Sequence, residues 1–179
     1  MCGIVGYIGD KTEGKKVVLE GLYRLEYRGY DSAGIAYVEE DDIKVVRAKG
    51  AVSGLDKKCN GISPQALVIG HTRWATHGKP SEENAHPHKS FNGKLAIVHN
   101  GIIENYKHLK ELLRDEGYIF RSETDTEVLA NWIELTMMRY DLSLGDATHR
   151  ALKSVHGAYA ICVVDASACL LYTSDAADE

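Results

Sequence analysis

The sequence predicts an α+β fold in which sheets and helices form separate layers. The apolar runs that predict strands come in groups along the chain and do not alternate strictly with helices. Between these groups, longer segments carry apolar residues at helical spacing. With 179 residues, of which 44% are hydrophobic and 26% charged, the chain is long enough for one domain with a substantial core.

Six short apolar runs predict the strands of this fold. They lie at residues 4–8, 35–38, 43–46, 66–69, 95–98 and 158–164. The second and third runs are joined by the acidic turn 39–42, which is typical of a hairpin. The run at 66–69 is continuously apolar, so its strand is expected to be buried.

Four segments predict helices, at residues 12–27, 105–117, 124–139 and 143–155. Gly29 gives the first of them a stop signal. Thr124 with Glu127, and Ser143 with Asp146, form capping patterns at the start of the last two. The polar segment 50–64 is expected to be largely irregular, with room for a short helix.

Composition excludes several classes of protein. A net charge of −5 without basic clusters argues against a nucleic-acid partner. The sequence has neither an apolar run of about 18 residues nor a leader peptide, so we expect a cytoplasmic protein without a membrane span. The four cysteines lack CxxC spacing and favour reduced thiols over disulfides; they are Cys2, Cys59, Cys162 and Cys169. No cofactor is predicted.

The first nine residues contain a candidate nucleophile, Cys2. Removal of Met1 would place a thiol and a free α-amine on this one residue. An α-amine has a pKa of ~7.7–8.0, so a sizeable fraction is neutral near physiological pH and can accept the thiol proton. The apolar run that follows is expected to anchor Cys2 at the edge of a sheet. The alternative is a buried cysteine that happens to lie near the start of the chain.

Residues 71–88 have neither helical nor strand periodicity, yet they carry four histidines, an arginine and a tryptophan. This composition does not suit a packed core and indicates a functional loop. A zinc site built on the four histidines is an alternative; they are His71, His77, His86 and His88. We do not predict a metal, because no cysteine or acid has ligand spacing here and Pro87 distorts the last pair.

Six motifs occur in order along the chain: CGIVG from residue 2, LEYRGYDSAG at 25–34, HTRWATHG at 71–78, NAHPH at 84–88, HNG at 99–101 and SETDTE at 122–127. Together they resemble the glutaminase domain of the glutamine–fructose-6-phosphate aminotransferases. These are class II amidotransferases with an N-terminal nucleophile. The resemblance extends from residue 2 to about residue 165. It implies a four-layer α/β/β/α sandwich with Cys2 at the end of a central strand.

The resemblance also implies the catalytic roles. Cys2 attacks the side-chain amide of glutamine, and its own α-amine carries the proton. The Asn100 side chain and the Gly101 backbone N–H form the oxyanion hole. Taken alone, Asn100 and Gly101 are explained as a turn. The ordered occurrence of all the motifs favours the catalytic interpretation.

Substrate-binding roles follow from the same resemblance, for Arg73, Trp74, Thr76, His77, Gly101 and Asp125. Arg73 is expected to hold the α-carboxylate of glutamine through two hydrogen bonds, which lysine cannot reproduce. Asp125 is expected to hold the α-ammonium from the first turn of its helix, with its carboxylate at an exposed end. Alone, Asp125 is explained as a helix-terminus charge. Three further residues are expected to support the pocket: Arg28, Tyr30 and His86.

The expected domain organisation is a glutaminase domain at 2–168, C-terminally incomplete, without the sugar isomerase domains of the family. In the full-length enzyme the ammonia would convert fructose 6-phosphate to glucosamine 6-phosphate, in a homodimer or larger oligomer. Alternatives are an amidophosphoribosyltransferase-like glutaminase or an inactive glutamine-binding fragment. Residues 169–179 are predicted to be a non-native tail, because their codons can match read-through of a sequencing adapter. The alternative there is a strand at 170–173 followed by an acidic tail.

Overall fold

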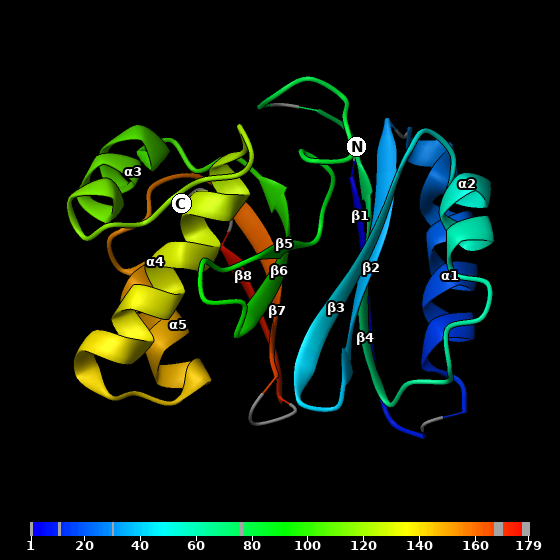
Figure 1. Cartoon of the computed structure of the whole chain (residues 1–179). Coiled ribbons are helices and arrows are strands. Elements are labelled where there is room, and N and C mark those ends of the chain that lie inside the picture. Colours follow the sequence, from blue (N-terminus) through cyan, green and yellow to red (C-terminus); the bar gives the residue numbers. More distant parts are fainter. Residues whose placement is uncertain (1, 11, 30, 76, 167–169, 177–179) are drawn as a thin grey trace.

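The computed structural model describes residues 2–10, 12–29, 31–75, 77–166 and 170–176. Two antiparallel four-stranded sheets lie face to face, and helices cover the outer face of each (Figure 1). The layers therefore run helix, sheet, sheet, helix. This arrangement confirms the predicted α+β class and the four-layer sandwich. Among the described residues, no helix is long and apolar enough to cross a membrane.

The first sheet has the strand order β1-β4-β2-β3. Its strands are β1 (Gly3–Ile8), β2 (Ser32–Glu39), β3 (Asp42–Lys49) and β4 (Leu67–Arg73). The predicted hairpin is β2 and β3, whose two turn residues, Glu40 and Asp41, have φ values of 50° and 61°. Positive φ at both positions matches the right-handed twist of a tight hairpin.

β1 has a hydrogen-bonded neighbour on one side only among the described strands, namely β4. The expectation that Cys2 lies at the end of a central strand is therefore wrong for the sheet described here, because β1, which begins directly after Cys2, is an edge strand; the expectation of a sheet edge is right. The pairing of Gly3 with Thr72 sets the end of β1 beside the end of β4. This register brings Cys2 next to the residues that follow Arg73.

The second sheet has the order β5-β6-β7-β8. Its strands are β5 (His88–Lys89), β6 (Leu95–Gly101), β7 (Tyr159–Asp165) and β8 (Leu170–Ala176). The two-residue β5 was not predicted. β8 pairs along its length with β7. The strand alternative thus describes the conformation of 170–176, and the non-native origin of that segment stays a prediction.

The helices are α1 (Gly14–Leu25), α2 (Val52–Lys58), α3 (Tyr106–Asp115), α4 (Asp125–Tyr140) and α5 (Leu144–Leu152), with a 3₁₀ turn, η1, at Glu26–Arg28. α1 and α2 pack on the first sheet through a core that includes Val18, Leu22 and Leu55. The other three helices pack on the second sheet, where Ile133 of α4 and Ile97 of β6 belong to one core.

A third core fills the space between the two sheets. Its buried members are mostly small or β-branched; they are Ala36, Ile43, Leu67, Ile69, Ala96, Val98, Cys162, Val164 and Ala166. Small side chains let the sheets approach closely. The core therefore holds the ends of β4 and β6 against each other.

Two central strands run further than the apolar pattern indicated. β4 continues through His71 to Arg73, inside the stretch expected to be irregular, because Arg73 pairs with Ser32 of β2. β6 continues to Gly101, which pairs with Tyr159 of β7. Pairing with β2 at the end of β4, and with β7 at the end of β6, overrides the local polarity of these residues. As a result, polar side chains extend from the ends of two rigid strands.

The predicted capping residues fix the start of α4, but only one of the two hydrogen bonds of a capping box is formed as expected. Thr124 Oγ1 accepts a hydrogen bond from the Glu127 N–H at 3.3 Å, as a capping box requires. The Glu127 carboxylate, however, accepts from the N–H groups of Arg121 and Ser122, at 2.8 and 2.7 Å. Glu127 thus holds the segment before the helix, and this sets the position of Asp125.

Candidate active site

Cys2 lies where the first sheet meets the loop after β4. Its Sγ accepts a hydrogen bond from the Trp74 backbone N–H at 3.0 Å. Burial raises the pKa of the Cys2 thiol above its usual value, and the Trp74 N–H acts in the opposite direction. The thiol is thus mainly protonated in this state. A nearby base is therefore needed to produce the thiolate.

Asn100 reaches Cys2 from the second sheet. Its Nδ2 donates to the Cys2 carbonyl at 3.4 Å, and its Oδ1 lies 2.8 Å from Nε2 of His71. The next residue, Gly101, has a φ of 124°, and a Cβ there would lie 2.1 Å from the Ala158 carbonyl oxygen. Only glycine fits at that position. The end of β6 is therefore a fixed platform beside the thiol.

A cavity of about 470 Å³ opens next to these groups. This volume is in the range of ~300–1,000 Å³ typical of small-molecule sites. It is lined by nine of the residues predicted from the sequence: Cys2, Arg28, Arg73, Trp74, His77, His86, Asn100, Gly101 and Asp125. The other two predicted residues, Tyr30 and Thr76, lie outside the described residues, as does Met1.

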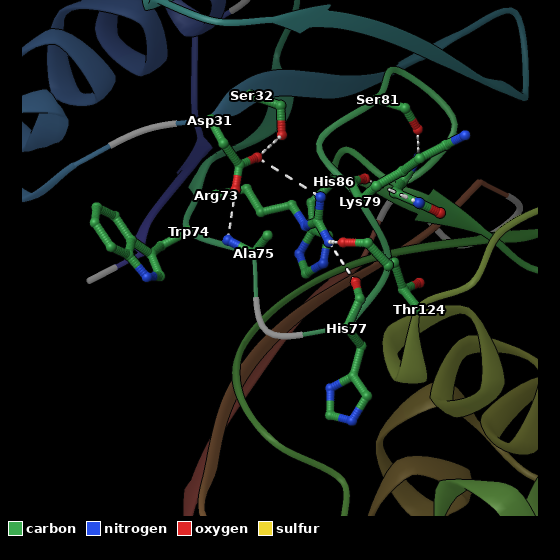
Figure 2. A network of polar contacts seen from close by, with 12 residues as sticks. Asp31, Ser32, Arg73, Trp74, Ala75, His77, Lys79, Ser81, His86 and Thr124 are labelled. Carbon is green, nitrogen blue, oxygen red and sulfur yellow. Dashed lines mark hydrogen bonds and ion pairs between the residues drawn. The ribbon is translucent and has the colours of Figure 1, made fainter.

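Arg73 is buried at the end of β4, with 3% of its surface exposed. Its Nη2 donates to the backbone carbonyls of His77 and Gly78, the second at 3.0 Å, so it shapes the loop after β4 (Figure 2). Its Nη1 lies 3.6 Å from an Asp31 carboxylate oxygen. Nη1 has no hydrogen-bond partner in the described part of the chain. One side of the guanidinium is thus held by loop carbonyls, and the other faces the Asp31 carboxylate.

Asp31 holds the opposite side of the same loop. Its carboxylate accepts hydrogen bonds from the Ala75 backbone N–H and from the Ser32 hydroxyl, the latter at 2.7 Å (Figure 2). The Asp31 backbone N–H donates to the Arg73 carbonyl at 2.8 Å. Because Trp74 lies between these two contacts, Asp31 fixes the backbone that donates to the Cys2 sulfur.

Asp125 is the first residue of α4 and is only 3% exposed. The expectation that its carboxylate lies at an exposed end is therefore wrong, because the chain after β6 covers the helix N-terminus. Its Oδ2 accepts from the Ile103 backbone N–H at 2.9 Å and lies 3.9 Å from Nδ1 of His77. A buried carboxylate with these two neighbours can still accept hydrogen bonds from a cationic ligand.

Four histidines are buried beside the cavity: His86 and His99, which line it, and His71 and His88, which do not. The rings of His71 and His86 stack with their centroids 4.2 Å apart. Burial lowers the pKa of all four, in the case of His71 to about 3, so they are neutral near physiological pH. Among the described residues, no group of three or more potential ligands is arranged to hold a metal ion, so the zinc alternative gains no support.

Sequence reasoning did not single out every residue of the site. Four further residues line the cavity: His99, Ile102, Thr124 and Thr126. Each of them adjoins a predicted residue, so a search of sequence neighbours would have found them. His71 and Asp31 lie within the quoted motifs, yet their contacts with Asn100 and Arg73 depend on strand pairing and are not visible in the sequence.

A profile of the glutamine amidotransferase domain matches residues 39–175. The chain belongs to this family. Curated relatives are glutamine–fructose-6-phosphate aminotransferases (isomerizing). The protein from Gloeobacter violaceus is 52% identical over 168 residues, and that from Thermus thermophilus 54% over 164 residues. The matches cover 93% and 91% of this chain but only 27% and 26% of the relatives, so the chain spans about a quarter of their length.

Solved structures agree with this family assignment. The glutamine phosphoribosylpyrophosphate amidotransferase of B. subtilis, solved with ADP and GMP, superposes with a TM-score of 0.77 at 28% sequence identity. The match covers 93% of this chain and 35% of that one. The resemblance inferred from the motifs is therefore confirmed, and the fold is that of the N-terminal-nucleophile amidotransferases.

Proposed function

We propose that this domain hydrolyses the side-chain amide of L-glutamine to glutamate and ammonia through a thioester on Cys2. One observation carries the proposal: Cys2, Asn100 and Asp125 come from three distant parts of the chain and line one cavity. The family assignment supports the same reaction. The proposal requires that Met1 be removed, so that Cys2 has a free α-amine.

The proposed chemistry has two half-reactions. In the first, the Cys2 α-amine takes the thiol proton, and the sulfur attacks the amide carbon of glutamine. Asn100 Nδ2 and the Gly101 N–H donate to the resulting oxyanion. Ammonia leaves with the proton returned by the α-amine, and the γ-glutamyl thioester remains. In the second, the same amine takes a proton from water, the resulting hydroxide attacks the thioester, and glutamate and the thiol are released.

Two charged residues are proposed to orient the substrate. Asp125 lines the cavity, and its carboxylate accepts from the Ile103 N–H and lies near His77, so it suits the α-ammonium of glutamine. Arg73 also lines the cavity, and its guanidinium suits the α-carboxylate. Trp74, Thr76 and His77 are proposed to line or cover the same pocket.

The role of the complete protein is proposed from its relatives. The names of these relatives favour transfer of the ammonia to fructose 6-phosphate, and 52–54% identity supports this over other acceptors. We infer that the sugar-binding part lies in sequence beyond this chain. We also infer a cytoplasmic, dimeric or larger enzyme that binds no nucleic acid.

The test is intact-protein mass spectrometry after treatment with 6-diazo-5-oxo-norleucine, an electrophilic glutamine analogue. The mass must first show that Met1 is absent. We expect one adduct, on Cys2, that excess glutamine prevents. A folded sample without Met1 that gives no adduct would overturn the proposal and would favour a glutamine-binding fragment without catalysis.

A second candidate is a glutaminase that serves a phosphoribosylpyrophosphate-dependent enzyme. The superposition on the B. subtilis amidotransferase favours it. Its lower sequence identity, 28%, ranks it behind the first candidate. The two share the glutaminase chemistry and differ in the acceptor, so sequencing the gene beyond residue 179 distinguishes them.

A further inference from the structure

The Asn100 side-chain amide is held from both ends. Its Nδ2 donates to the Cys2 carbonyl, and its Oδ1 lies 2.8 Å from His71 Nε2. An amide oxygen only accepts hydrogen bonds, so the proton of the neutral His71 ring must be on Nε2. His71 Nδ1 is buried and has no hydrogen-bond partner among the described residues, as expected for the nitrogen that carries the lone pair.

The two hydrogen bonds of the Asn100 amide differ in length and therefore in strength. The contact with the Cys2 carbonyl is long, at 3.4 Å, and ties the amide to the residue that must react. The contact with His71 is of ordinary length. The His71 N–H can bond only to the amide oxygen of Asn100, so this contact fixes which way round the amide group lies. Without it, the Asn100 amide could rotate and turn its oxygen toward a developing oxyanion, which would repel it.

His71 is itself rigid. It lies on β4, paired with Ile4 on one side and Gly34 on the other, and its side chain is fully buried. Its ring stacks on His86 at 4.2 Å, and the Nδ1 of His86 accepts from the His99 backbone N–H at 3.3 Å. The donor to Asn100 thus has one position and one orientation.

We propose that His71 is a positioning residue that acts across the boundary between the two sheets and fixes the Asn100 amide with its N–H₂ group toward the developing oxyanion. This inference rests on the proposed glutaminase function. His71 contacts neither the substrate nor the thiol. It acts only through Asn100.

The expected effect is on turnover and not on binding. Loss of one oxyanion donor costs about 10²–10³ in kcat. A His71→Leu variant, which keeps an apolar side chain but loses the donor, should lower kcat by about 10–100-fold. The KM for glutamine should change by less than about threefold, because the charged ends of the substrate are held elsewhere. His71→Gln retains an N–H donor and should recover most of the rate.

A double-mutant cycle with Asn100→Ala separates a positioning effect on Asn100 from a non-specific disturbance of the active-site structure. If His71 acts through Asn100, adding His71→Leu to Asn100→Ala should lower kcat no further. An equal loss of rate in both backgrounds would overturn the inference, as would an unchanged kcat in His71→Leu alone. Ser90→Ala is the matched control, because Ser90 donates to Glu134 in a buried contact away from the cavity.

A measurement that does not need turnover decides the inference even if the parent protein fails to hydrolyse glutamine. Long-range ¹H–¹⁵N spectra report which ring nitrogen of His71 is protonated. We expect the Nε2–H form, and we expect the Asn100 side-chain amide signal to shift in His71→Leu. An Nδ1–H form would overturn the inference. Absent hydrolysis by a folded parent without Met1 would instead overturn the proposed function.

Discussion

Replacement of Asp125 by asparagine tests the proposed recognition of the glutamine α-ammonium. Asparagine keeps the shape of the side chain and an oxygen that accepts from the Ile103 N–H, so α4 should start as before. Only the negative charge is lost. The wild-type carboxylate is 3% exposed, so water screens it little.

The magnitude follows from this burial. Removing one partner of a buried, hydrogen-bonded charge pair costs about 2–4 kcal/mol, which is a factor of about 30–1,000. We expect a loss of this size in kcat/KM for glutamine, mostly through KM. The assay is steady-state glutamate release, with thermal unfolding as a check on the fold.

Glutaramate, the glutamine analogue without an α-amine, sharpens the test. Wild-type protein should discriminate strongly against it, whereas Asp125→Asn should treat the two substrates almost alike. Glu123→Gln is the matched control: it removes a neighbouring exposed charge that contacts Asn84 and does not line the cavity. If Asp125→Asn retains the wild-type preference for glutamine, another residue binds the α-ammonium.

Three further outcomes are expected. Cys2→Ala should abolish glutamate release while glutamine still binds in calorimetry; residual turnover would exclude Cys2 as the nucleophile. Arg73→Lys should raise KM by at least about tenfold with a smaller change in kcat, and an unaltered KM would contradict carboxylate binding by Arg73. The buried histidines have folded-state pKa values below the unfolded value of ~6.5, so their contribution to stability is complete above that pH and is lost progressively below it. The urea midpoint should therefore fall between pH 7.5 and 5.5, and less steeply in His71→Gln; equal slopes would contradict a neutral, buried His71.

The sequence was sufficient for most of the architecture, because apolar periodicity reports burial directly. The hairpin around Glu40 and the helix beginning at Asp125 both have strong local signals: a turn between two apolar runs and a capping pattern. The ends of β4 and β6 have none. Polar residues such as His71 and Asn100 are strand residues only because neighbouring strands pair with them, and that pairing is not local information.

The sequence was sufficient to predict which residues form the site, but not how their side chains are arranged. Ordered motifs brought Cys2, Arg73 and Asp125 into one prediction. The sequence could not show that one side of the Arg73 guanidinium is engaged by loop carbonyls. It also suggested an exposed Asp125, since a helix N-terminus is usually near solvent, whereas the segment around Ile103 covers it.

The core between the sheets has a consequence for how variants of this domain should be interpreted. Cys2 extends from one sheet and Asn100 from the other, so the spacing of the two layers sets the distance between the Cys2 thiol and the Asn100 amide. Small side chains such as Ala36 and Ala96 define that spacing. A larger side chain at one of these positions would push the two sheets apart. Cys2 and Asn100 would then lie further from each other, although the substituted residue contacts neither of them. Natural variation at these positions should therefore track catalytic rate across relatives, even where thermal stability is unchanged.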